Sequence, residues 1–78
     1  MAAPFALLLE EVRGADVAAA IARWEQLGVR AYGLQQDDGS VRIFAGAFET
    51  AAQAVWLAST LRDLGADPQV AYRTGRMF

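Results

Sequence analysis

Two stretches of the sequence decide the fold: VAAAIARWEQLG at residues 17–28 and AVWLASTLRDLG at residues 54–65. The stretches are 37 positions apart, and in both of them apolar residues recur at i, i+3, i+4, i+7 and i+10, with Gly following the last. This spacing forms one apolar stripe on a helix, and glycine readily adopts the left-handed conformation that ends a helix. The sequence therefore contains two half-repeats, with helices predicted at residues 15–27 and 50–64.

Both predicted helices carry signals at their N-terminal ends. Thr50, with Gln53 three residues later, has the pattern of a capping box. Asp16, which follows the helix breaker Gly14, places a carboxylate near the positive end of the first helix. These signals support the two predicted starts.

A strand-like run precedes and follows each predicted helix, at residues 5–9, 29–34, 41–45 and 69–73. The Asp38-Gly39 pair is typical of a hairpin, so the second and third strands are expected to be antiparallel neighbours. The order βαββαβ predicts one α+β domain over residues 1–78, with half-repeats at about 5–35 and 41–73 and a ferredoxin-like architecture. Its four-stranded antiparallel sheet has both helices on one face, with the first and third strands in the centre and the second and fourth at the edges, or in a swapped pairing.

The composition argues against most kinds of active site. The chain has no Cys and no His, all seven of its basic residues are Arg, and its net charge is −2. Without a thiol, an imidazole or an amine, the usual catalytic groups are missing, so we expect no enzymatic activity and no cofactor. The negative balance is unfavourable for phosphate contacts, so we expect no nucleic-acid partner. No apolar run reaches the length of a transmembrane helix, so we expect no direct membrane insertion by this segment.

If both helices cover one face of the sheet, the opposite face is bare and open to a ligand. Strand alternation gives the residues expected on that face: Ala6, Leu8, Glu10, Arg42, Phe44 and Gly46. In the last strand Val70 and Tyr72 share one side, and alternation alone leaves open which face that side belongs to. The expected binding surface is a shallow platform of Leu8, Arg42, Phe44 and Tyr72.

The run VRIFAGAF at residues 41–48, followed by a helix with Ala54, Leu57, Leu61 and Leu64-Gly65, resembles the second half of a SPOR (sporulation-related) domain. The likeness extends more faintly over residues 5–73. It implies a bacterial cell-division module of the cell envelope, with a periplasmic or extracytoplasmic location. It also implies binding of septal peptidoglycan glycan strands through the open sheet face. Arg42, Phe44 and Val70 match binding positions of the family, with Leu8 and Tyr72 beside them.

The chain departs from the family pattern in its first strand and before the arginine. Leu8 and Glu10-Glu11 stand where the family has Gln and a Gly-Ser pair, and Ser40 replaces an aromatic residue. Leucine neither stacks on a sugar ring nor bonds its hydroxyls. The alternative function is a protein-interaction or self-association domain, with a protein partner or a homodimer, that has lost glycan binding. A third possibility is an effector-binding regulatory domain.

Several residues have a structural interpretation beside the functional one. Arg42 either contacts a ligand or pairs with Glu10 or Glu11. Trp24 lies within its helix stripe and is expected in the core, whereas Trp56 lies on the far side of its helix and is a candidate partner contact. Asp37 and Asp38 fit turn chemistry better than a metal site, so no metal is expected.

Overall fold

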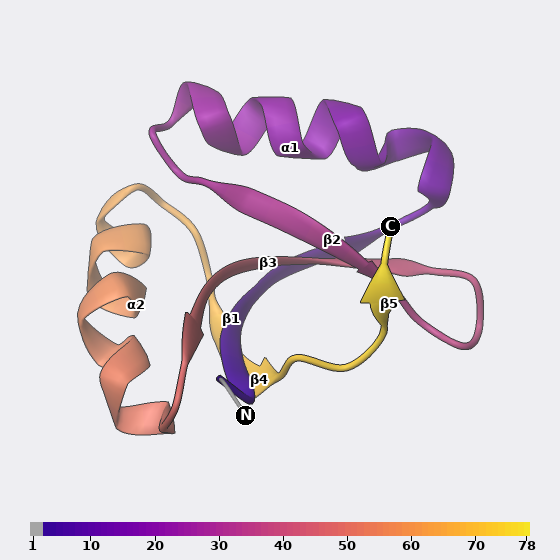
Figure 1. Cartoon of the computed structure of the whole chain (residues 1–78). Coiled ribbons are helices and arrows are strands. Elements are labelled where there is room, and N and C mark those ends of the chain that lie inside the picture. Colours follow the sequence, from indigo (N-terminus) through magenta and orange to yellow (C-terminus); the bar gives the residue numbers. More distant parts are fainter. Residues whose placement is uncertain (1–2) are drawn as a thin grey trace.

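The computed structural model describes residues 3–78 as an α+β fold with two α-helices and a five-stranded antiparallel sheet (Figure 1). The strands and α-helices are β1 (Phe5–Val12), α1 (Val17–Gln26), β2 (Ala31–Gln35), β3 (Val41–Phe48), α2 (Val55–Asp63), β4 (Gln69–Tyr72) and β5 (Arg76–Met77). The short 3-10 helices η1 (Gly14–Asp16) and η2 (Ala51–Ala54) lead into α1 and α2. Both α-helices are therefore shorter than the sequence predicts, because their first turns are wound more tightly.

The sheet order is β4-β1-β3-β2-β5, and every neighbouring pair is antiparallel. The prediction that the first and third strands are central is confirmed, as is the hairpin that joins β2 to β3. The prediction of four strands is wrong by one. The C-terminal segment adds β5 to the free edge of β2, where Leu34 pairs with Met77 and Gln35 with Arg76.

The predicted helix ends are largely confirmed. Thr50 and Gln53 form the full capping box, with the Gln53 side chain accepting from the Thr50 backbone N–H. Gly28 and Gly65, which follow the two helices, both have positive φ angles, of 81° and 90°. Asp16 stands at the N-cap of α1, but its side chain makes no capping hydrogen bond there.

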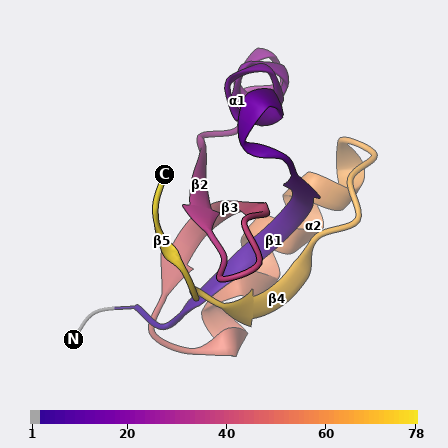
Figure 2. The ribbon, with the colours of Figure 1, turned by 90° about the vertical axis from the view of Figure 1, so that its right-hand side faces the viewer.

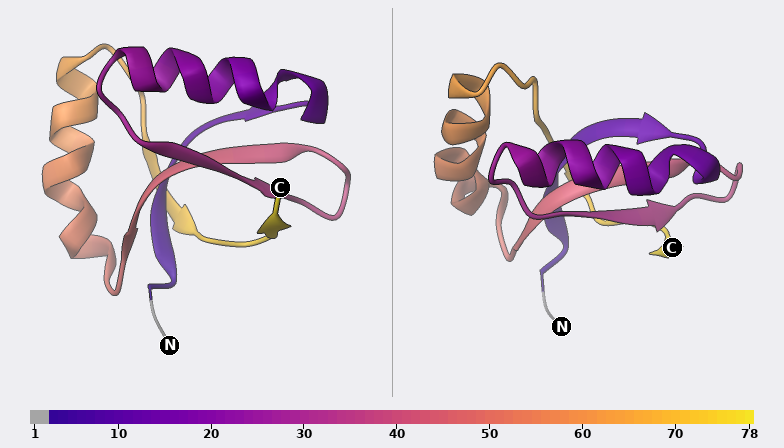
Figure 3. Two further views of the ribbon diagram at one scale, coloured as in Figure 1. Left: turned by 45° about the horizontal axis from the view of Figure 1, so that its top comes forward. Right: turned by 90° about the horizontal axis from the view of Figure 1, so that it is seen from above.

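The main core lies between the helices and one face of the sheet. One of its clusters joins α2 to the central strands through Leu7, Ala45, Ala54, Ala58 and Leu61, together with Val29. The other joins α1 to β3 through Val17, Ala20, Val41 and Ile43. Both helices thus cover the same face, and Figure 3 shows them running in different directions along a strongly curved sheet.

Each central strand contains an irregularity that bends it. In β1 the register with β3 shifts between Leu8 and Glu10, so Leu9 is an extra residue. Leu7 of β1 pairs with Ala45 of β3, and Phe5 pairs with Phe48, so β3 has one residue more than β1 between these two pairs. Within this interval Gly46 has a φ of 74°. Extra residues of this kind increase the local twist and bend of a strand. They account for the curvature of the sheet.

The bulge in β1 corrects the expected position of Glu10. Because Leu9 is an additional residue, Glu10 pairs with Ile43 and shares its side, toward the helices, instead of lying on the open face. There the Trp24 indole Nε1–H donates to Glu10 Oε2 at 2.7 Å, and Arg23 pairs with Glu10 at 3.5 Å. Trp24 is half-buried and packs against both core clusters.

Candidate functional site

The face opposite the helices is organised in two rows of side chains across the strands. Paired residues of an antiparallel sheet lie on the same side, so the register assigns each row. The first row runs through Glu11, Arg42, Leu34 and Met77. The second row runs through Gln69, Leu8, Phe44 and Tyr32.

The sequence predicts that Phe44 is exposed on this face. This prediction is wrong, because Phe44 is completely buried. It forms a separate cluster with Ala6 and Leu34, against which Leu8, Tyr32 and Ala71 pack. The Tyr32 ring stacks on Phe44 with centroids 6.0 Å apart. The curvature of the sheet brings these side chains together over Phe44. Phe44 therefore lies beneath the surface of this face and cannot contact a ligand.

Val70 and Tyr72 do not belong to the platform either. Val70 pairs with Leu7 and Tyr72 with Phe5, which places both on the side of the sheet that carries the helices. Both are exposed there, because neither is covered by a helix, and Tyr72 stacks on Phe5 with centroids 4.9 Å apart. The expected platform is therefore divided between two faces.

Arg42 lies on the face opposite the helices, and its side chain is 37% exposed. Its Nε is 3.4 Å from Glu11 Oε2, so the pairing with Glu11 considered from the sequence is present and the one with Glu10 is not. Ser40 Oγ also donates to Glu11, and both its hydroxyl and its backbone N–H donate to Asp38. These hydrogen bonds from Ser40 lower the pKa of the Asp38 carboxyl below its ordinary value.

The lower end of this face, where β1 begins, is closed by the segment that joins β4 to β5. Because β4 and β5 occupy opposite edges, residues 73–75 must cross the sheet, as Figure 2 shows. The Arg73 guanidinium lies 5.6 Å from the Tyr32 ring centroid and donates to the Tyr32 hydroxyl and the Ala3 carbonyl. Gln36 and Thr74 exchange two further hydrogen bonds. The face is thus uncovered only in its upper part, toward the end of β1.

Five residues of this face were not expected from the sequence: Tyr32, Leu34, Gln69, Arg73 and Met77. Gln69 was assignable only from the register of β4 on β1, which places it opposite Leu8. Arg73 belongs to the crossing segment, and Met77 belongs to β5, a strand of two residues that is too short to show alternation. Tyr32 lies in a predicted strand and pairs with Phe44 across the hairpin. Since alternation places Phe44 on this face, the pairing of the two strands would have placed Tyr32 there as well.

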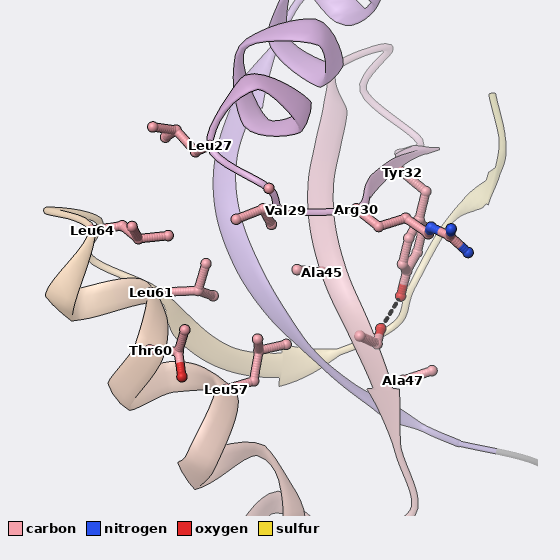
Figure 4. Close-up of a pocket in the computed structure, with 12 residues that line it drawn as sticks. Leu27, Val29, Arg30, Tyr32, Ala45, Ala47, Leu57, Thr60, Leu61 and Leu64 are labelled. Atoms are coloured by element: carbon pink, nitrogen blue, oxygen red, sulfur yellow. Dashed lines mark hydrogen bonds between the residues drawn. The ribbon is translucent and has the colours of Figure 1, made fainter.

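A hollow lies between α2, the start of β2 and the bend of β3, mainly on the helix side of the sheet, and Tyr32 borders both it and the opposite face (Figure 4). It has a volume of about 590 Å³. Its walls are mainly aliphatic, and its lining comprises Leu27, Gly28, Val29, Arg30, Tyr32, Ala45, Gly46, Ala47, Leu57, Thr60, Leu61 and Leu64. Leu27 and Leu64 at its rim are 50% and 44% exposed. We call this hollow the interhelix groove.

Trp56 is 79% exposed on the outer side of α2, as the helical phase predicts. Its role as a partner contact stays a prediction. Over residues 3–78, acidic side chains nowhere gather into a group of three or more that could hold a metal ion. Neither α-helix in this range is long and apolar enough to span a membrane.

Comparison with known proteins finds no match for the chain. No protein family, no curated protein and no solved structure matches it.

Proposed function

We propose that the chain is a non-catalytic binding module of the SPOR type, which binds peptidoglycan glycan strands in a bacterial cell envelope, outside the cytoplasmic membrane. In this proposal the fold is a ferredoxin-like βαββαβ arrangement with β5 as an added strand. The binding surface is the upper part of the face opposite the helices. Leu8 and Arg42 contribute to it from the expected set, and Phe44 supports it from below.

The observation that supports this proposal most directly is the half-exposed Arg42 in a central strand, with polar neighbours on the same face. Glu11 lies opposite Arg42 on β1, and Gln69 lies opposite Leu8 at the β4 edge. Guanidinium, carboxylate and amide groups suit the hydroxyl and N-acetyl groups of a glycan, since they supply both donors and acceptors. Leu8 lies between Gln69 and Phe44 in the same row and adds apolar surface without a hydrogen bond to the glycan.

Aromatic stacking contributes little to this proposed surface. One side of the Tyr32 ring stacks on Phe44 and a guanidinium lies over the ring, while Tyr72 is on the opposite face. Hydrogen bonds from Arg42 and Gln69 therefore carry the recognition. Each polar group exchanges water for sugar, so a modest affinity is expected from the sheet face.

The test is co-sedimentation of the domain with purified sacculi at low salt. Arg42→Ala should reduce the bound fraction strongly and leave the melting temperature within a few degrees, because a half-exposed arginine contributes about 0–1 kcal/mol. Arg62→Ala, which removes the same charge from the exposed side of α2, is the matched control and should bind normally. Wild-type protein that stays in the supernatant, or equal loss in both variants, contradicts glycan binding by this face.

The second candidate function is a protein-interaction or self-association module. It is favoured by one observation, the large exposed apolar side chains of α2, among which Trp56 and Val55 are 79% and 63% exposed. Tryptophan is enriched among the residues that dominate protein interfaces. Light scattering over a concentration series tests self-association, and a mass that stays monomeric and unchanged by Trp56→Ala counts against it.

A further inference from the structure

The interhelix groove carries an inference independent of glycan binding, because Arg42, Leu8 and Gln69 do not line it. Its volume of about 590 Å³ falls within the range of about 300–1,000 Å³ typical of small-molecule sites. Figure 4 shows the side chains of Leu57, Leu61 and Leu64 extending from α2 toward Val29 and Ala45. The middle of the groove thus consists of aliphatic walls.

The apolar side chains that line the groove favour an aliphatic ligand over a sugar or a nucleotide. The middle of the groove presents leucine, valine and alanine side chains, with the Thr60 hydroxyl at its α2 side. A polar ligand would lose hydrogen bonds to water there without gaining others, which is costly. An alkyl chain would gain burial and would also cover the exposed rim leucines, Leu27 and Leu64.

The positive charge of Arg30 at the sheet end of the groove favours a ligand with a negatively charged head group. Arg30 is exposed and is the single charged residue of the lining, and it has no carboxylate partner among residues 3–78. It points toward Tyr32 in Figure 4, and Arg73 lies over the same Tyr32 ring. Arg73 also lacks a carboxylate partner within the described range. Arg30 is therefore the cation of the groove itself, beside Tyr32, whereas Arg73 reaches the same ring from the segment that crosses the opposite face of the sheet.

We propose that the interhelix groove binds a single-chain aliphatic carboxylate of the fatty-acid class. The alkyl chain lies between α2 and β3, among Leu57, Leu61 and Leu64. The carboxylate meets the guanidinium of Arg30 at the sheet end, where a fork of donors matches its two oxygens. No acidic residue lines the groove to oppose this head group.

The experiment is titration of the labelled full chain with dodecanoate, kept below its micelle concentration, and followed by the amide signals in NMR. Dodecyltrimethylammonium, with the same chain and the opposite charge, is the matched ligand. Dodecanoate should shift signals of Ala45, Leu57, Leu61 and Leu64 in a saturable way, and the cationic ligand should bind about tenfold more weakly or not at all.

Two variants test the two ends of the groove. Arg30→Gln should weaken dodecanoate binding about tenfold, the loss expected for one charge-assisted hydrogen bond. Leu64→Asp places a negative charge at the apolar rim and should abolish binding. Arg62→Gln removes the same charge as Arg30→Gln from a helix position outside the lining and should bind as the wild type does.

Other outcomes overturn the proposal. Equal affinity for the two ligands means that the head group is not recognised. Shifts confined to Trp56 and its neighbours mean that the ligand adheres to the exposed face of α2, and Trp56→Ala would then abolish them. Equal weakening by Arg30→Gln and Arg62→Gln means that net charge alone is responsible.

Discussion

The two half-repeats have the same helix pattern but use it differently. Trp24 of α1 and Leu61 of α2 are equivalent positions, 37 residues apart. Leu61 is completely buried in a single apolar cluster, whereas Trp24 is half-buried, spans two clusters and donates a hydrogen bond to Glu10. The first half thus has a polar anchor under its helix, and the second half relies on apolar packing alone.

The strands of the two halves differ more than the helices. At the same shift of 37 residues, Leu7 is equivalent to Phe44, but Leu7 faces the helices and Phe44 faces the other side. A displacement of one residue reverses the face of every side chain in a strand. The half-repeats therefore match in helix phase, and their first strands are offset by one residue, whereas Tyr32 and Gln69, equivalent residues of the second strands, lie on the same face.

The largest effect is expected in the second half, for Leu61→Ala. The side chain is fully buried with Leu7 and Ala58, so its removal leaves a cavity and should cost about 3 kcal/mol of the free energy of unfolding. That is a large part of the total stability of a domain of this size. Chemical denaturation followed by circular dichroism measures the effect. A cost below about 1 kcal/mol would mean that α2 is not packed as described.

Gly46→Ala tests the bulge of β3 and should cost about 2 kcal/mol. The residue has a φ of 74°, and an added Cβ would lie 2.6 Å from the Phe48 ring. Gly39→Ala is the matched control, since its φ is 88° and nothing lies within 4 Å of the added Cβ. The control should lose only the backbone part, about 1 kcal/mol. Equal losses in thermal melts would show that the Phe48 contact does not matter.

The sequence predicts those parts of the fold that depend on local patterns. The stripe residues, the capping box at Thr50 and the terminal Gly28 and Gly65 all follow from short-range spacing. The central placement of β1 and β3 follows from the order of elements and the hairpin. In each of these cases the determining residues are close together in the chain or constrained by connection rules.

The site was harder to predict, because it depends on interruptions of the pattern. Uninterrupted alternation places Glu10 on the open face, and the single extra residue Leu9 moves it to the helix side. Phe44 is buried because the curved sheet brings Tyr32 and Leu8 over it, an effect of residues 12 and 36 positions away in the chain. The interhelix groove depends on where α2 lies against β3, which no local spacing encodes.

In the first half, Trp24→Phe should cost about 1–2 kcal/mol. The ring keeps much of its apolar contact, but the 2.7 Å hydrogen bond from the indole to the Glu10 carboxylate is lost. Urea denaturation by circular dichroism measures the change. In a double-mutant cycle with Glu10→Gln, the two effects should not add, because both variants weaken the same bond. Simple additivity would mean that the bond contributes nothing.

The smallest effect is expected for Trp56→Ala, which separates the outer face of α2 from its buried face. Trp56 is 79% exposed, so its replacement should change the free energy of unfolding by less than about 0.5 kcal/mol. Alanine also has the higher helix propensity, which offsets part of any lost contact. The expected contrast with Leu61→Ala, five residues along the same helix, is therefore severalfold. If both variants melted equally early, the helical phase that assigns Leu61 to the core and Trp56 to solvent would be wrong.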